Sequence, residues 1–189
     1  MSMTASNPNE SANGRRTHIF QGDYHVSRDP NEVVSTILGS CVAACVRDPV
    51  AAIGGMNHFL LPGKIEGSNS DNHALAAGVH LMELLINGLL REGARRDRLE
   101  AKIFGGARTV KSLSDIGALN VNFATRFLQI EGIAIKPGST GGTSGRRLQF
   151  WPATGRIRQG LISPTTAELE PPRPISSCVK PNAGEVELF

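Results

Sequence analysis

Two apolar runs flank one strong turn signal in the first third of the chain. They cover residues 41–47 and 51–60, and the pair Asp48-Pro49 separates them. A turn-forming pair between two apolar runs is typical of a β-hairpin. If the hairpin is centred between Pro49 and Val50, residues equidistant from that point lie opposite each other, and Cys41 faces His58. Opposed residues have Cβ atoms about 4.5–5.5 Å apart, so the pattern predicts a cysteine–histidine contact.

The rest of the chain predicts both strands and helices. A helix is expected over residues 72–91, with Leu75, Val79, Met82, Leu85, Ile86 and Leu89 facing inward at three- and four-residue steps. A second amphipathic helix is expected over 120–131, ending at Gly132. Short runs rich in apolar and β-branched residues predict strands over residues 19–26, 32–38, 99–104, 133–136, 147–152 and 156–162.

Polarity sets the expected limits of the folded part. Residues 1–17 are rich in Ser, Asn and Gly and predict a disordered tail, and the Pro-rich residues 163–189 predict an extended or disordered one. Between them, residues 18–162 are expected to form one domain. A polar loop over residues 63–72 follows His58, and the interpretation as a plain connector is favoured over a role bordering a site.

Composition narrows the classes of function. Three cysteines in 189 residues make no disulfide framework and favour a reducing compartment. No spacing typical of zinc ligands occurs, and neither a metal nor a cofactor is expected. No apolar run is long enough to span a bilayer and no signal-peptide core is present, so a cytoplasmic protein is expected. The net charge of +3 comes from local basic clusters, which does not indicate a nucleic-acid surface.

Cys41 is the candidate nucleophile. A cysteine beside a histidine forms a thiolate near neutral pH, which is the chemistry of cysteine hydrolases. Gly39 and Ser40 precede it, and such small residues let a substrate carbonyl approach backbone N–H groups, as an oxyanion site requires. Cys45 shares the strand face of Cys41 but lacks this glycine approach, so it is interpreted as a small buried hydrophobe.

His58 needs a third polar group to orient its ring if it acts as a base. Ser35, Thr36, Ser40 and Asn57 are near in sequence, and no acidic residue is well placed upstream. A hydroxyl is therefore favoured over a carboxylate. The glycine-rich residues 138–145 lack the lysine of a phosphate-binding loop, so nucleotide binding is not expected there.

Several ordered blocks resemble the signature of the CheD family of bacterial chemoreceptor glutamine deamidases. The resemblance covers roughly residues 18–162. Its blocks are Leu38-Gly39-Ser40-Cys41-Val42-Ala43, Arg47-Asp48-Pro49, Gly55-Met56-Asn57-His58-Phe59-Leu60-Leu61-Pro62, Ala101-Lys102-Ile103-Phe104-Gly105-Gly106-Ala107, Ile116-Gly117 with Asn120, and Gly141-Gly142 with Gly145-Arg146.

The resemblance implies a fold and a set of site residues. The fold is α+β, a layered β-sandwich core flanked by helices, similar to that of deamidating cysteine-hydrolase toxins. Cys41 is implied as the nucleophile and His58 as its base. In the family a threonine upstream of the cysteine completes the triad, and the motif places that position at Ser35, with Thr36 adjacent. Serine there keeps the hydroxyl and loses the methyl group that restrains its rotamer.

The implied reaction is hydrolysis of glutamine side-chain amides on methyl-accepting chemotaxis receptors. Backbone N–H groups near residues 39–41 are expected to stabilise the oxyanion. Two alternatives stay open: an adaptor that binds receptors or a CheC-type phosphatase, with catalysis secondary, and a cysteine deamidase with another protein substrate. The acidic and apolar residues 184–189 are a possible docking peptide for such a partner, although a frayed tail is the favoured interpretation. Neither nucleic acid nor membrane insertion is implied.

Overall fold

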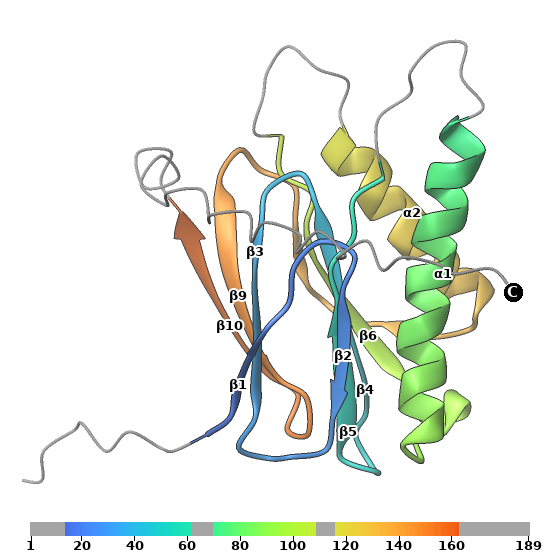
Figure 1. Cartoon of the computed structure of the whole chain (residues 1–189), viewed down its shortest axis with the longest axis vertical. Coiled ribbons are helices and arrows are strands. Elements are labelled where there is room, and N and C mark those ends of the chain that lie inside the picture. Colours follow the sequence, from blue (N-terminus) through green and yellow to red (C-terminus); the bar gives the residue numbers. More distant parts are fainter. Residues whose placement is uncertain (1–13, 62–69, 109–115, 163–189) are drawn as a thin grey trace, which may run out of the picture.

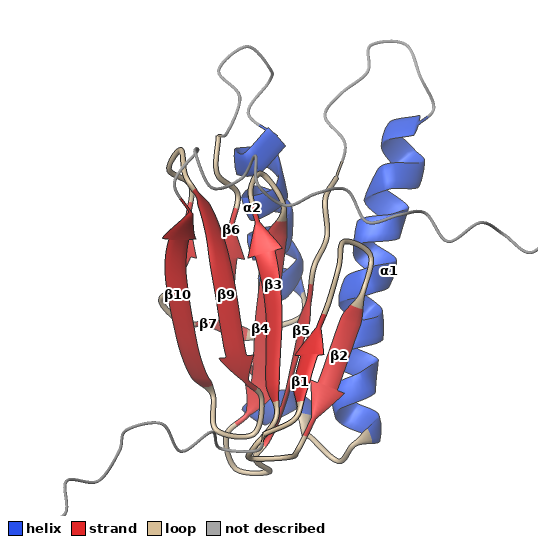
Figure 2. Ribbon diagram, turned by 60° about the vertical axis from the view of Figure 1, so that its left-hand side comes forward, coloured by secondary structure: helices blue, strands red, loops and turns tan. Residues whose placement is uncertain are grey.

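The protein is a sandwich of two β-sheets with two helices on one outer face (Figures 1 and 2). The computed structural model describes residues 14–61, 70–108 and 116–162. The predicted fold class, an α+β layered sandwich flanked by helices, is confirmed. The predicted C-terminal tail lies outside the described residues, as do residues 1–13 of the N-terminal one.

The smaller sheet has four strands in the order β1-β3-β9-β10. β1 runs parallel to β3, and the other neighbours are antiparallel. The strands are β1 (Arg16–His18), β3 (Val33–Leu38), β9 (Gly145–Trp151) and β10 (Arg156–Ile162). The predicted tail therefore ends too late, because Arg16 and Thr17 already pair with β3.

The larger sheet has six strands, five in the order β2-β5-β4-β6-β7, with β8 also pairing with β6. Its strands are β2 (Tyr24–Ser27), β4 (Val42–Asp48), β5 (Ile53–Asn57), β6 (Glu100–Gly105), β7 (Ala134–Ile135) and β8 (Ser139–Thr140). The single strand predicted over residues 19–26 is wrong. Gly22, at φ +92°, turns the chain there, so that β1 and β2 lie in different sheets.

Two helices, α1 (Ser70–Arg91) and α2 (Ile116–Ile130), pack on the larger sheet, and a short 3₁₀ helix, η1 (Arg96–Arg98), precedes β6. Met82, Leu85 and Leu89 of α1 are fully buried, as its periodicity predicts. Leu75 is not, with 49% of its surface exposed, because the first turns of α1 project beyond the strands (Figure 2). α2 begins four residues earlier than predicted.

β4 is the central strand of the core because both of its faces are covered. Val42, Ala44 and Val46 belong to the apolar cluster beneath the helices. Ala43 and Cys45 belong to the cluster between the sheets, with Phe150 of β9 opposite. This two-sided burial explains why the sequence of β4 is continuously apolar and does not alternate.

Candidate active site

The candidate site lies where three connections meet at one end of the sandwich, the upper end in Figure 1. They are the β1–β2 turn over residues 19–23, the β3–β4 connection over 39–41, and the chain leaving β5. Cys41 precedes β4 by one residue, and His58 follows β5 by one residue. Each lies at the end of a paired strand, so the hairpin fixes the backbone of both.

The pairing of β4 with β5 corrects the predicted hairpin. Val42 and Phe59 exchange two backbone hydrogen bonds of 2.9 Å, so Cys41 is not directly opposite His58. The register differs by two residues because the Asp48 carboxylate accepts the N–H groups of Val50 and Ala51, which lengthens the loop to four residues.

The shift keeps both side chains on one face of the sheet, since side-chain direction repeats every two residues. Cys41 packs against the cluster between the two sheets, and Met56, two residues before His58, belongs to that cluster. Cys41 and His58 are therefore diagonal neighbours across the two strands. Such pairs lie about 7 Å apart at their Cβ atoms, within reach of an imidazole.

Thr36 of β3 orients the imidazole of His58 from the opposite sheet. Its Oγ1 donates to the carbonyl of Ile19 at 2.8 Å and lies 2.8 Å from Nδ1 of His58. A hydroxyl has one proton, so Oγ1 must accept the Nδ1–H. The neutral ring then carries its lone pair on Nε2, which is buried and has no hydrogen-bond partner among the described residues. This tautomer leaves Nε2 ready to take a proton.

Ser35 lies on the other face of β3, away from His58. Its hydroxyl is 3.2 Å from Nδ1 of His18 and 3.5 Å from the carbonyl of Thr17, both in β1. Of the two hydroxyls proposed from the sequence, the structure therefore brings Thr36 to His58 and not Ser35. β3 points Val34, Thr36 and Leu38 toward the inter-sheet core, which makes Thr36 99% buried.

The backbone around Cys41 is held by the end of β6. Gly106 N–H donates to the carbonyl of Cys41 at 2.7 Å, and Ala107 N–H donates to that of Gly39 at 2.8 Å. Gly105, at φ +107°, allows this approach, because a Cβ there would lie 2.2 Å from the Cys41 oxygen. With these carbonyls held in place, the backbone N–H groups of Gly39 and Cys41 favour negative charge on the Cys41 sulfur, which lowers the pKa of its thiol.

The pKa shifts of Cys41 and His58 both favour the uncharged form of the side chain. Burial raises the pKa of the Cys41 thiol above its ordinary value, and the N–H groups of Gly39 and Cys41 only partly oppose this. Burial lowers the pKa of His58 to about 4, helped by the nearby His18 and opposed by Asp23. Near neutral pH these shifts favour a thiol and a neutral imidazole over a thiolate and an imidazolium.

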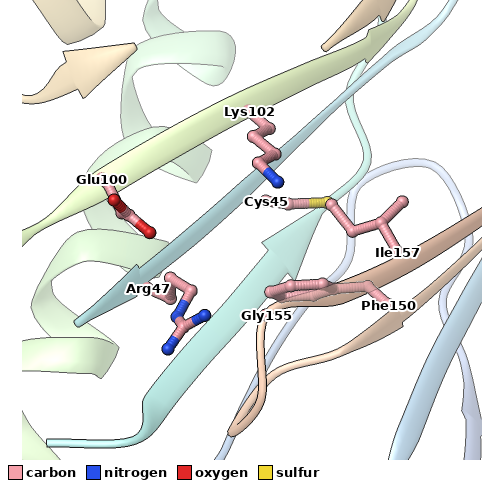
Figure 3. Close-up of a pocket in the computed structure, with 7 residues that line it drawn as sticks. All are labelled: Cys45, Arg47, Glu100, Lys102, Phe150, Gly155 and Ile157. Atoms are coloured by element: carbon pink, nitrogen blue, oxygen red, sulfur yellow. The ribbon is translucent and has the colours of Figure 1, made fainter. Parts of the chain in front are cut away.

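Cys45 lies in a different environment on the same face of β4. It is 97% buried beside Phe150 and Ile157, with Lys102 nearby (Figure 3). Burial strongly raises the pKa of its thiol, and the positive charge of Lys102 opposes this only in part. A thiol this buried stays protonated and unreactive, which agrees with its interpretation as a small hydrophobe.

The glycine-rich residues 138–145 fold around the buried side chain of Arg146. The guanidinium donates to the carbonyls of Ser139 and Gly141. Carbonyls rather than N–H groups therefore point into this loop, which is the opposite of a phosphate-binding arrangement. Residues 140–142, together with Gly106, line a surface hollow of about 230 Å³ beside the candidate site.

No cluster of three metal-binding side chains occurs within the described residues. None of the helices in that part of the chain is long and apolar enough to cross a membrane.

The sequence analysis missed the β1–β2 turn. The Oε1 atom of its Gln21 lies 3.8 Å from the Cys41 sulfur, and the charge of its Asp23 opposes the lowering of the His58 pKa. The pair Gly22-Asp23 is a turn signal that marks this segment.

Comparison with known proteins gives consistent results. A family model described as CheD chemotactic sensory transduction matches residues 60–159. The chain is 58% identical over 175 residues to a protein of Rhizobium leguminosarum bv. trifolii named "Probable chemoreceptor glutamine deamidase CheD", covering 88% of this chain and 95% of that protein. A protein of the same name from Sinorhizobium medicae is 59% identical over 160 residues, covering 85% of this chain and 87% of that protein.

Solved structures resemble the chain more distantly. The Neisseria meningitidis protein NMB0706 is 10% identical, with a TM-score of 0.45 over 68% of this chain and 64% of that one. The Bacillus licheniformis hypothetical protein YfiH is 14% identical, with a TM-score of 0.40 over 70% of this chain and 61% of that one.

Proposed function

The chain belongs to the CheD family, and on this premise we propose that it converts specific glutamines of methyl-accepting chemotaxis receptors to glutamate, releasing ammonia. Relatives named chemoreceptor glutamine deamidases, up to 59% identical, support both the reaction and the substrate class. The observation that carries the chemistry is the 2.8 Å contact between Thr36 and His58, which leaves Nε2 unprotonated on the sheet face that His58 shares with Cys41.

The first half of the reaction forms a thioester. Cys41 Sγ attacks the amide carbon of the substrate glutamine while Nε2 of His58 removes the thiol proton. The amide oxygen becomes an oxyanion, and backbone N–H groups over residues 39–41 are the proposed donors to it, since those of Gly39 and Cys41 already favour negative charge on the Cys41 sulfur. The imidazolium then protonates the leaving nitrogen, so the C–N bond breaks and ammonia departs.

The second half hydrolyses the thioester. His58, neutral again, takes a proton from a water molecule, which attacks the thioester carbon. The C–S bond breaks and the sulfur recovers its proton from His58. Thr36 holds the imidazole in one orientation through both halves and takes no part in proton transfer, because its own proton is engaged by the carbonyl of Ile19.

The receptor cytoplasmic domains are the proposed substrates, and the cytoplasm is the proposed site of action. A CheC-type phosphatase is a further proposed partner. The Arg146 side chain is 97% buried and bonded to the carbonyl of Ser139, so it is not available to meet an acidic receptor surface. Arg95 pairs with Asp97, and Arg96 pairs with Glu131, each on the protein surface.

Mass spectrometry of purified receptor cytoplasmic domains incubated with the protein tests this function. A gain of about one dalton at specific glutamines is expected with the wild type and with Cys45→Ala, and none with Cys41→Ala. Cys45→Ala is the matched control, because it removes a thiol four residues away that packs in the same inter-sheet cluster. If wild-type protein alters receptor signalling while no glutamine changes mass, the adaptor role replaces the enzyme.

A further inference from the structure

The β1–β2 turn is fastened to the backbone of His58 on both sides. Gly22 N–H donates to the His58 carbonyl at 2.8 Å, and His58 N–H donates to the carbonyl of Asp23 at 3.0 Å. Asp23 N–H also donates to the carbonyl of Phe20 at 3.0 Å, which closes the turn. The residue between Phe20 and Gly22 is Gln21, so its backbone is fixed relative to the candidate base.

The side chain of Gln21 reaches from this turn to the nucleophile. The thiol of Cys41 donates to Oε1 of Gln21 at 3.8 Å, at the solvent-exposed mouth of the site. No hydrogen bond joins Cys41 to His58 in the described structure, so the carboxamide of Gln21 is the polar side-chain partner of the resting thiol. A group in contact with the attacking sulfur is also close to the amide that the sulfur attacks.

A carboxamide carries an acceptor and a donor on one carbon. Oε1 suits the neutral thiol, which has a proton to give. Once His58 removes that proton, the sulfur and then the substrate oxygen carry negative charge, and only a donor is stabilising there. Gln21 is exposed, so rotation about its last side-chain bond exchanges Oε1 for Nε2 without moving the turn.

We propose that Gln21 is a further catalytic residue, whose side-chain N–H stabilises negative charge on the Cys41 sulfur and on the substrate amide oxygen during attack. The inference rests on the proposed deamidase function. Gln21 adds a donor from the β1–β2 turn to the backbone N–H groups of the β3–β4 connection, so that the oxyanion is held from two sides. Removing one such donor costs about 10²–10³-fold in kcat in other hydrolases.

Gln21→Met is the sharpest test because it keeps the side-chain length and removes both polar ends. We expect kcat for receptor deamidation to fall about 10²-fold while KM changes less than about threefold. Gln149→Met is the matched control, since Gln149 lies on the outer face of β9 and should leave both constants unchanged. Thermal unfolding should be the same for all three proteins, because the turn is held by backbone hydrogen bonds.

Gln21→Glu separates charge from bulk. A carboxylate near the sulfur should lower kcat further than methionine does, and it should move the pH profile of Cys41 alkylation by iodoacetamide to higher pH. Equal kcat in Gln21→Met and wild type would overturn the proposal. A higher kcat/KM in Gln21→Met would also overturn the proposal, because it would mean that the Gln21 side chain hinders access of the substrate to the Cys41 thiol. If wild type itself changes no glutamine, the proposed deamidase function fails and the role of Gln21, which rests on it, falls with it, an outcome distinct from a wild type and Gln21→Met of equal kcat.

Discussion

Polar side chains are buried near both ends of β4, but their hydrogen bonding differs between the two ends. At the far end, the Asp48 carboxylate is fully buried and accepts from the N–H groups of Val50, Ala51 and Arg95 and from the Arg98 guanidinium. At the near end, His58 is 94% buried and its Nε2 has no partner in the described structure. The buried carboxylate at the far end therefore accepts several hydrogen bonds, whereas the buried Nε2 atom at the near end accepts none from the described residues.

The two pKa shifts express the same difference. The hydrogen bonds around Asp48 together outweigh the cost of its burial and lower its pKa to about 2, so the charged form is the stable one. Burial lowers the pKa of His58 to about 4 with no compensating partner at Nε2. A buried polar group without a hydrogen bond lowers the free energy of unfolding. The unpaired Nε2 of His58 therefore destabilises the near end, and the same lone pair is the one that the proposed base uses.

The largest effect is expected at the far end. Asp48→Asn removes the negative charge from Arg98 and leaves the Arg95 N–H with a poorer acceptor, which should lower the free energy of unfolding by about 3 kcal/mol. Urea denaturation followed by circular dichroism measures this loss. The rate of deamidation per folded molecule should stay within about twofold of wild type. A large fall in that rate would mean that the two ends are not independent.

A slightly smaller effect is expected at the near end, and on activity instead of folding. Thr36→Val keeps the shape of the side chain but removes the acceptor for His58 Nδ1–H, which should lower kcat about 10²-fold, or about 2.7 kcal/mol. Ser35→Ala is the matched control, because Ser35 bonds to β1 and not to His58. The comparison uses steady-state deamidation rates, and a greater loss in Ser35→Ala would reverse the assignment of the orienting hydroxyl.

The smallest effect is a pH dependence of stability that belongs to His58. Its pKa is about 4 in the folded protein and 6.5 as a free side chain, so the unfolded chain binds a proton first as the pH falls. Stability is fully present above pH 6.5 and is lost on acidification toward pH 4. The loss should be about 1 kcal/mol by about pH 5.5. Paired denaturation curves of wild type and His58→Gln isolate this contribution, and parallel pH profiles would contradict it.

The sequence paired the proposed nucleophile with the proposed base for a reason that survives the error in the predicted hairpin. The predicted hairpin was wrong by two residues, and an error of one would have moved His58 to the other face of the sheet. The choice between Ser35 and Thr36 stayed open in the sequence for a different reason. The chain passes from the smaller to the larger sheet between Leu38 and Val42, so the alternation of side chains along β4 does not continue back into β3 and cannot choose between two adjacent hydroxyls.

The contribution of Gln21 was beyond sequence reasoning because it depends on a long-range contact. Apolar and β-branched residues over 19–26 favour one strand, and although the pair Gly22-Asp23 signals a turn, only the tertiary hydrogen bonds place that turn against His58. The helices were easier to predict, because Met82, Leu85 and Leu89 repeat with a clear period. Local patterns therefore located the helices and most of the strands, and contacts between the sheets completed the candidate site.

The bond between Thr36 and His58 has a consequence for protein engineering. It crosses from the smaller sheet to the larger one, so the β4–β5 hairpin transplanted into another scaffold would carry Cys41 and His58 but leave the orienting hydroxyl behind. The smallest portable unit of this chemistry is the pair of facing sheets together with the turn that joins β1 to β2.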